Sequence, residues 1–215
     1  AGGGLTSGGT QASELVFSGT SGGLRPWPVT VSGVSTFTAA STTLDLVDGG
    51  NSTMFSVSGA GSVADLSAVS PLVFGSTTSA TTQFVTANVG LIDLSSLTTL
   101  TANDADDGLT IRTISSNSEM RLGKLTTLTD NVTLSSSGAG AVFDVSGLAT
   151  LGGASDVVLS ANSSSLLDAS GLTPLGSGTD VDLTVSGGAV LDLGSLTSFG
   201  SVNDLTVTSA NAGSA

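Results

Sequence analysis

A nine-residue pattern of apolar and polar positions recurs along this chain. It consists of an apolar residue, an aspartate, an apolar residue, two small residues, an apolar residue, two polar residues and a final apolar residue. The clearest copies are residues 143–151, 167–175 and 191–199. Repetition at a fixed period of about 20 to 50 residues is typical of folds whose neighbouring repeats stack on one another. The pattern therefore predicts a stacked repeat protein.

The same pattern can be followed towards the N-terminus, with longer intervals. The positions at the centre of successive copies are Thr30, Asp65, Asp93, Arg121, Asp144, Asp168 and Asp192. The last three set a period of about 24 residues, and the earlier intervals require insertions. Residues 55–59 fit the pattern as well, so the register between 45 and 65 is ambiguous at this point.

Each repeat also contains a second apolar segment, in which apolar and polar residues alternate. Clear examples are residues 109–111, 181–185 and 205–207, and residues 44–46 fit the same pattern. Short alternating runs bounded by Gly, Ser and Asn are typical of β-strands. The Leu-x-x-Leu spacing of Leu172 and Leu175 does not fit a flat strand. It predicts a bend that turns both leucines inward.

Together these segments predict an all-β fold, a parallel β-helix (β-solenoid) of about seven coils of about 24 residues. A right-handed path is expected, because connections between parallel strands are almost always right-handed. We expect residues 1–28 to form a Gly/Ser-rich segment with a cap on the first coil. Residues 15–17 in it resemble the longer strand of a preceding coil. Residues 29–215 would form the solenoid, as part of a longer chain.

The composition agrees with a packed β-protein and restricts the classes of partner that it can bind. Mean hydropathy is +0.41 and no cysteine is present, so disulfides are excluded. The apolar runs are far shorter than the roughly 20 residues of a membrane helix, so no membrane insertion is expected. With 4 basic and 17 acidic residues, the net charge is −13. Such a chain lacks the Lys/Arg contacts that nucleic acids require, but its acidity can collect divalent cations.

The first candidate site is a surface ladder formed by one residue per coil. It comprises Asp93, Arg121, Asp144, Asp168 and Asp192, with Asp65 as a less certain member. Like charges about 5 Å apart repel by roughly 1 kcal/mol in water. Arg121 can relieve this by pairing with Asp93 or Asp144, and bound Ca²⁺ could relieve the rest. The alternative is a solvated column whose carboxylates accept backbone N–H groups at the following Ser-Gly corner.

The second candidate is a metal site at Asp104, Asp106 and Asp107, which lie in an insertion that ends at Gly108. Crowded carboxylates in a loop suit Ca²⁺, a cation that prefers oxygen ligands. The spacing matches neither the EF-hand loop nor the glycine-rich nonapeptide of calcium-binding β-rolls. A solvated turn rich in Asp and Asn is the alternative interpretation.

The residues available for catalysis are few. Without His, Cys or Tyr, serine triads, thiol chemistry and the usual zinc sites are excluded. Carboxylates with Arg112, Arg121 and Lys124 remain, and parallel β-helix polysaccharide lyases and hydrolases use such groups. Those enzymes usually carry long aromatic loops, whereas this chain has one tryptophan, Trp27. We therefore expect no catalytic residues and no enzymatic activity.

A strip of threonines between the corner leucines is a further candidate surface. It comprises Thr98, Thr99, Thr126, Thr127, Thr150, Thr173 and Thr197. Regular threonine arrays on solenoids can bind ice, but Ala149, Pro174 and Ser198 interrupt this one. The alternative is that threonine is simply a favourable outward residue in strands.

Residues 166–172 followed by 180–185 resemble the degenerate β-solenoid repeats of giant bacterial surface proteins. These include adhesins, filamentous-haemagglutinin-like proteins, autotransporter passengers and some surface-layer proteins. The resemblance covers roughly 29–208 and is compositional and periodic, so it transfers no site residue. It implies a secreted or cell-surface stalk, fibre or lattice segment. Its partners would be other copies, neighbouring surface proteins or glycans. The alternatives are a carbohydrate-active β-helix enzyme and a solenoid that binds glycans or ice.

Overall fold

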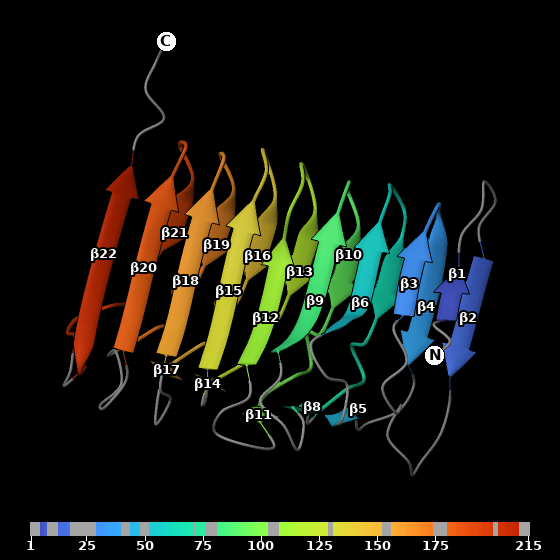
Figure 1. The fold of residues 1–215 in the computed structure, drawn as a ribbon, viewed down its shortest axis with the longest axis horizontal. Helices are drawn as coiled ribbons and strands as arrows, with labels where there is room; N and C mark the ends of the chain where they lie inside the picture. Colours follow the sequence, from blue (N-terminus) through green and yellow to red (C-terminus); the bar gives the residue numbers. More distant parts are fainter. Residues whose placement is uncertain are drawn as a thin grey trace.

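The computed structural model describes twelve ranges of the chain. They are residues 5–7, 13–17, 29–39, 44–47, 52–70, 72–75, 81–102, 108–128, 131–151, 156–173, 180–199 and 202–210. Within them the chain forms 22 strands and no helix. Every strand pairing in these ranges is parallel, and successive coils lie side by side along the long axis (Figure 1). The predicted all-β parallel β-helix is confirmed.

Two large sheets form two sides of the solenoid. The sheet that we call the long sheet contains, in spatial order, β1 (Leu5–Ser7), β3 (Val29–Ser32), β6 (Ser52–Ser58), β9 (Thr81–Ala87), β12 (Gly108–Thr113), β15 (Asn131–Ser137), β18 (Asp156–Asn162), β20 (Asp180–Ser186) and β22 (Asp204–Ala210). The short sheet contains β2 (Ser13–Phe17), β4 (Ser35–Ala39), β7 (Val63–Asp65), β10 (Leu91–Asp93), β13 (Glu119–Arg121), β16 (Val142–Asp144), β19 (Leu166–Asp168) and β21 (Val190–Asp192).

Shorter strands form a third side, seen along the lower edge of Figure 1. They are β5 (Leu44–Val47), β8 (Leu72–Gly75) and β11 (Leu100–Ala102) in one sheet, and β14 (Thr127–Leu128) and β17 (Thr150–Leu151) in another. A bridge between Thr99 and Thr127 links the two. One coil thus runs from a long strand through a turn to a short strand, then through a corner to the third side.

The predicted period of about 24 residues is confirmed in the second half of the chain. Val157 pairs with Val181 and Val181 pairs with Leu205, each 24 residues further along. The sheets continue past the seven coils counted from the sequence, because β1 and β2 pair with β3 and β4.

Three assignments made from the sequence are wrong in register. Thr30 lies in β3 and pairs with Ser56 of the long sheet, whereas Thr38 occupies the position beside Asp65. Residues 15–17 lie in β2 of the short sheet, not in a longer strand. Residues 44–46 belong to β5 on the third side. Apolar alternation marks strands on all three sides equally, so it cannot tell them apart.

Differences in coil length lie mainly in two places. In the coils of Asp65, Asp93, Arg121 and Asp144, seven positions separate the end of the short strand from the last corner leucine, as from Asp93 to Leu100. In the coil before them the count is six, from Thr38, which pairs with Asp65, to Leu44, which pairs with Leu72. The turn between long and short strands has from two residues (33–34) to five (114–118). The largest differences lie between the corner leucine and the next long strand, where seven residues (101–107) follow Leu100 and two (129–130) follow Leu128. This edge therefore absorbs most of the insertions.

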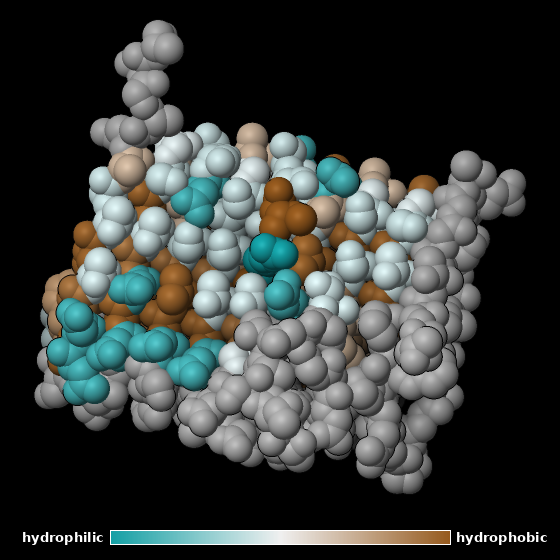
Figure 2. Space-filling view, viewed as in Figure 1, coloured by the Kyte–Doolittle hydropathy of each residue, from teal (hydrophilic) through white to brown (hydrophobic). Residues whose placement is uncertain are grey.

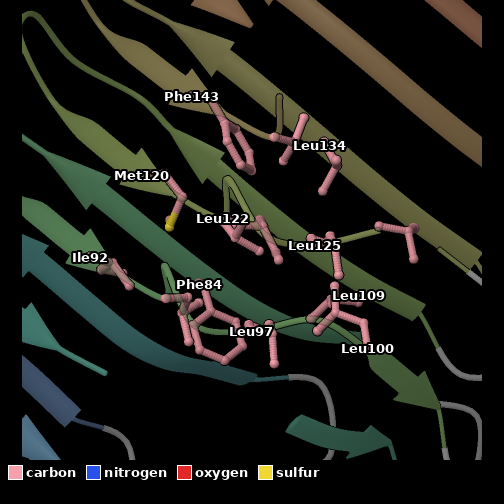
Figure 3. Close-up of a cluster of buried hydrophobic side chains, with 14 of the residues drawn as sticks. Phe84, Ile92, Leu97, Leu100, Leu109, Met120, Leu122, Leu125, Leu134 and Phe143 are labelled. Atoms are coloured by element: carbon pink, nitrogen blue, oxygen red, sulfur yellow. The ribbon is translucent and has the colours of Figure 1, made fainter. Parts of the chain in front are cut away.

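The core is a set of stacked columns of apolar side chains. In the long sheet, Phe84, Ile111 and Leu134 occupy paired positions in successive coils, and each has 0% of its surface exposed. Ile92, Met120 and Phe143 form the corresponding column of the short sheet. Figure 3 shows side chains from both sheets meeting in the interior. Burial of apolar surface stabilises by roughly 25 cal/mol per Å², so neighbouring coils stabilise each other.

The predicted inward bend at Leu-x-x-Leu is confirmed. Leu97 and Leu100 are both buried, as are Leu148 and Leu151. The N–H of Leu97 donates to the carbonyl of Leu94 at 2.9 Å, which closes a tight turn just before this segment. The chain leaves the turn at Leu97, and Leu97 and Leu100 are then both buried in the core.

Aromatic side chains fill the N-terminal half of the core. The rings of Phe55 and Phe84 are stacked, with centroids 5.2 Å apart, and Phe37 meets Phe55 edge-on at 5.8 Å. Stacked and edge-on pairs at this separation stabilise beyond their area burial, by about 0.5–1.5 kcal/mol each.

The turns between long and short strands use left-handed backbone conformations. Gly187 and Gly188 have φ values of 62° and 72°, which glycine adopts without strain. Two equivalent turns contain valine instead: Val34 has φ 54° and Val89 has φ 66°. A β-branched residue in this region costs roughly 1–2 kcal/mol. Both valines are about half exposed, so burial recovers little of that cost.

We predict that Leu148→Ala lowers the free energy of unfolding by roughly 2–5 kcal/mol, because Leu148 is fully buried between two coils. Leu196→Ala, at the equivalent corner of a later coil, should cost only about 1 kcal/mol, because Leu196 is partly exposed. Urea denaturation followed by circular dichroism measures both. Equal losses would contradict a core whose burial depends on the neighbouring coil.

We predict that Val89→Asn raises the free energy of unfolding by about 0.5–1 kcal/mol, because asparagine tolerates left-handed backbone better than valine. Val190→Asn is the matched control, since Val190 is similarly exposed but lies in strand β21. Thermal denaturation of both variants tests the prediction. A lower melting temperature for Val89→Asn would show that this turn is not strained.

Candidate functional site

The predicted surface ladder forms a continuous column on the short sheet. Asp65 pairs with Asp93, Asp93 with Arg121, and Arg121 with Asp144. Asp144 is followed by Asp168 and then by Asp192. All six side chains are partly exposed. We call these six residues the acidic column, and its members stack at the strand spacing of about 4.8 Å.

Each aspartate of the column accepts a hydrogen bond from the backbone two residues further on. This is a short-range Asx motif, in which Oδ1 accepts an N–H at 2.9–3.0 Å. The five donor–acceptor pairs are Ser67–Asp65, Ser95–Asp93, Ser146–Asp144, Ser170–Asp168 and Gly194–Asp192. The local role foreseen for these carboxylates is confirmed: they hold the corner that follows the short strand.

The same corners are held from the neighbouring coil. The N–H of Leu94 donates to the carbonyl of Arg121 at 2.9 Å, and that of Val145 donates to the carbonyl of Asp168 at 2.8 Å. The backbone of each column residue thus supports the turn of the coil before it, while its side chain supports its own turn. The column is therefore part of the structural framework.

Arg121 is the one basic residue in the column. Its Nε donates to Oε1 of Glu119 at 2.6 Å, and its Nη1 lies 3.6 Å from Oδ2 of Asp93. Of the two partners expected for Arg121, the structure therefore shows Asp93. The hydrogen bond to Glu119 is the largest cause that raises the pKa of Arg121, and partial burial acts against it. Arg121 stays charged and offsets repulsion in the middle of the column.

Glu119 was not foreseen as a member of this charge cluster. It lies two residues before Arg121 in β13, so the two side chains point to the same side of the strand. Period-two spacing of opposite charges in a short strand is the signal that could have found it.

Glycine is required at two corners because coils approach closely there. A Cβ added to Gly147 would lie 2.3 Å from the carbonyl oxygen of Gly123, and one added to Gly171 would lie 2.2 Å from that of Ser146. Real Cβ atoms do not approach oxygen so closely, so a side chain at either position would separate the coils.

The second predicted metal site lies outside the described residues. Asp104, Asp106 and Asp107 fall within 103–107, so the Ca²⁺ hypothesis for them stays a prediction. Among the residues that the structure describes, no group of three or more acidic residues is arranged to hold a metal ion. The described part also contains no helix that could span a membrane.

The basic residues considered for catalysis do not share one face. Arg112 lies in β12 of the long sheet, where its Nη2 donates to Oε1 of Gln83 at 3.4 Å. Arg121 lies in β13 of the short sheet, and Lys124 lies in the following corner. Only Arg121 and Lys124 therefore remain close to the acidic column.

The threonine strip forms two short rows at the corner between the short sheet and the third side. In one row, the N–H of Thr126 donates to the carbonyl of Thr98 at 3.3 Å. In the other row, Thr150 donates from Oγ1 to Oγ1 of Thr127 at 3.4 Å. Ala149 continues the first row, since its N–H donates to the carbonyl of Thr126. The interruption foreseen at Ala149 is thus real, and ice or glycan binding stays a prediction.

No protein-family model, no curated protein and no solved structure matches this chain.

We predict that Asp168→Ala lowers the free energy of unfolding by about 1 kcal/mol, because the N–H of Ser170 loses its acceptor. Asp168→Asn keeps an Oδ1 acceptor and removes a charge between Asp144 and Asp192. It should be at least as stable as the wild type at low salt, and this advantage should shrink as salt screens the repulsion. Thermal melts at several salt concentrations measure both variants.

A large loss of stability in Asp168→Asn would contradict this local role and would favour a bound cation. The Ca²⁺ hypothesis for the acidic column and for Asp104, Asp106 and Asp107 has its own measurement, a thermal melt with and without EDTA. A lower melting temperature in EDTA supports it, and an unchanged one counts against it.

Proposed function

We propose that this chain is a structural or adhesive segment of a secreted or cell-surface bacterial protein. The observation that carries the proposal is the single apolar core that runs through the stacked coils, with threonine, serine and aspartate facing outward. Such an architecture is rigid along its long axis and has long, polar lateral faces. A stalk, fibre or surface lattice uses both properties.

The charge distribution supports the same proposal. A net charge of −13 keeps an exposed repetitive surface soluble and disfavours non-specific contact with nucleic acids or anionic membranes. The aspartates of the acidic column already serve its corners through backbone hydrogen bonds. Their conformational role fits a framework better than a reaction centre.

The fold also needs no covalent cross-links. The chain lacks cysteine, and its coils are held by ladder hydrogen bonds and buried side chains. Stability of this kind does not depend on the redox state of the surroundings. A segment exposed outside the cell can therefore keep its shape without disulfides.

We predict that an antibody raised against the folded chain labels intact, unpermeabilised cells of the organism that encodes it, or its culture medium. An antibody against an abundant cytoplasmic protein is the control for cell lysis. Immunogold electron microscopy and fractionation provide the measurement. Labelling that appears only after permeabilisation, together with the cytoplasmic marker, would overturn the proposal.

A further inference from the structure

Hydroxyl side chains lie on both sides of the long sheet. Outward threonines and serines give this face much of its pale colour in Figure 2. A smaller set is buried at the edge where the long sheet turns into the short sheet. None of its members is more than 3% exposed, and they are Ser35, Ser62, Thr86, Thr113, Ser118, Ser136 and Ser165. Burying a hydroxyl without a hydrogen-bond partner is destabilising, so the partners of this set matter.

Ser165 shows how such a hydroxyl can connect two coils. Its Oγ donates to the carbonyl of Ser136, in the preceding coil, at 2.8 Å. The same Oγ accepts the N–H of Asn162, in its own coil, at 3.2 Å. Ser136 has a further partner, since its Oγ lies 3.0 Å from Oγ1 of Thr113. The hydroxyls of these coils are therefore satisfied within the protein.

Thr86 and Ser118 occupy the equivalent positions two coils earlier. In the long sheet, Thr86 stands in the same column as Ser136. In the short sheet, Ser118 and Ser165 each come directly before a strand, β13 and β19, at the same register. Ser118 is therefore placed against Thr86 of the preceding coil, as Ser165 is placed against Ser136.

Gly90, which comes directly before β10, follows the same geometry. A Cβ added to Gly90 would lie 2.6 Å from the carbonyl oxygen of Val57. Val57 belongs to the preceding coil and pairs with Thr86 in the long sheet. The residue before each short strand thus packs on the long-sheet column of the coil before it.

Three hydroxyls of the buried set have no hydrogen-bond partner among the residues that the structure describes, namely those of Ser62, Thr86 and Ser118. By the same geometry, Ser62 is placed against Val31, which carries no polar group in its side chain. Only Thr86 and Ser118 bring two unpartnered hydroxyls to one place.

A longer turn explains why Ser118 lacks the partners of Ser165. The turn that ends at Ser118 has five residues, and the turn that ends at Ser165 has three. In the longer turn the N–H of Ile114, the counterpart of Asn162, donates directly to the carbonyl of Thr86 at 3.0 Å. The Ser118 hydroxyl is therefore not inserted between that N–H and that carbonyl.

We propose that Thr86 and Ser118 bind one buried water molecule, which connects these two coils as the Ser165 hydroxyl connects a later pair. Buried waters make about three hydrogen bonds to polar groups that would otherwise be unsatisfied. The two hydroxyls supply two, and the second lone pair of the Thr86 carbonyl supplies the third. Two neutral hydroxyls, each able to donate or accept, suit water better than Ca²⁺, which takes about six to eight oxygen ligands. The inference concerns the interior and goes beyond the proposed function.

The variant Thr86→Val keeps the shape of the side chain and removes its hydroxyl. An unpartnered buried hydroxyl is destabilising, so without the water this change would raise the melting temperature. With the water bound, we expect the melting temperature to fall by about 2–4 °C, because the water loses a ligand. Thr113→Val is the control: it removes a hydroxyl that has a partner, and its melting temperature should fall in either case. An unchanged or higher melting temperature for Thr86→Val would overturn the proposal.

A double-mutant cycle tests whether the two hydroxyls share one ligand. Ser118→Ala should release the same water as Thr86→Val, so the loss in the double variant should be smaller than the sum of the two single losses. The control pairs Thr86→Val with Ser165→Ala, three coils away, where the losses should add. Additive losses for Thr86→Val with Ser118→Ala contradict a shared water.

A high-resolution crystal structure distinguishes a water from a direct contact. We expect one ordered water within hydrogen-bond distance of Oγ1 of Thr86 and Oγ of Ser118 in the wild type, and none there in the double variant. Two hydroxyls bonded directly to each other, with no water between them, would overturn the proposal. None of these results bears on where the protein is located in the organism, so the proposed function is tested separately.

Discussion

Burial of each coil's apolar side chains by the next coil is the interaction on which the rest of this structure depends. No single coil encloses a core, since its inward residues form only one layer. Leu148 and Leu172 are fully buried with a layer on each side, whereas Leu196 in the last coil is only partly buried. Stability is therefore shared between neighbours, as in other repeat proteins whose energetics are nearly one-dimensional.

The polar surface is organised by the same stacking. Parallel register places equivalent residues of successive coils side by side, so a residue type that recurs at one position of every repeat forms a column along the solenoid. Each aspartate stabilises its corner by accepting a backbone N–H. Each also lies beside another aspartate, and the repulsion between the two carboxylates is destabilising. Arg121, with Glu119 and Asp93, offsets that cost near the middle. The acidic column thus combines local support with long-range repulsion.

How much the sequence could predict depended on how distinctive each segment is. Asp144, Asp168 and Asp192 were placed in one column because a corner with fixed spacing follows each of them. Thr30 was misplaced because residues 32–34, Ser-Gly-Val, look like the Ser-Gly-Leu corner. The structure shows instead that Gly33 and Val34 form a left-handed turn between two strands. A position with left-handed backbone cannot be recognised from the sequence when valine occupies it in place of glycine or asparagine.

The concentration of length differences at one edge has a consequence for how this chain can change. From the coil of Asp65 to that of Asp144, the count between the short strand and the last corner leucine is constant, because both ends of this segment pair with the adjacent coil. Between the corner leucine and the following long strand no such count is kept. Genetic insertions there leave the core columns aligned, so new recognition sequences can accumulate along one margin of the protein. An engineer would graft a peptide epitope onto the same margin.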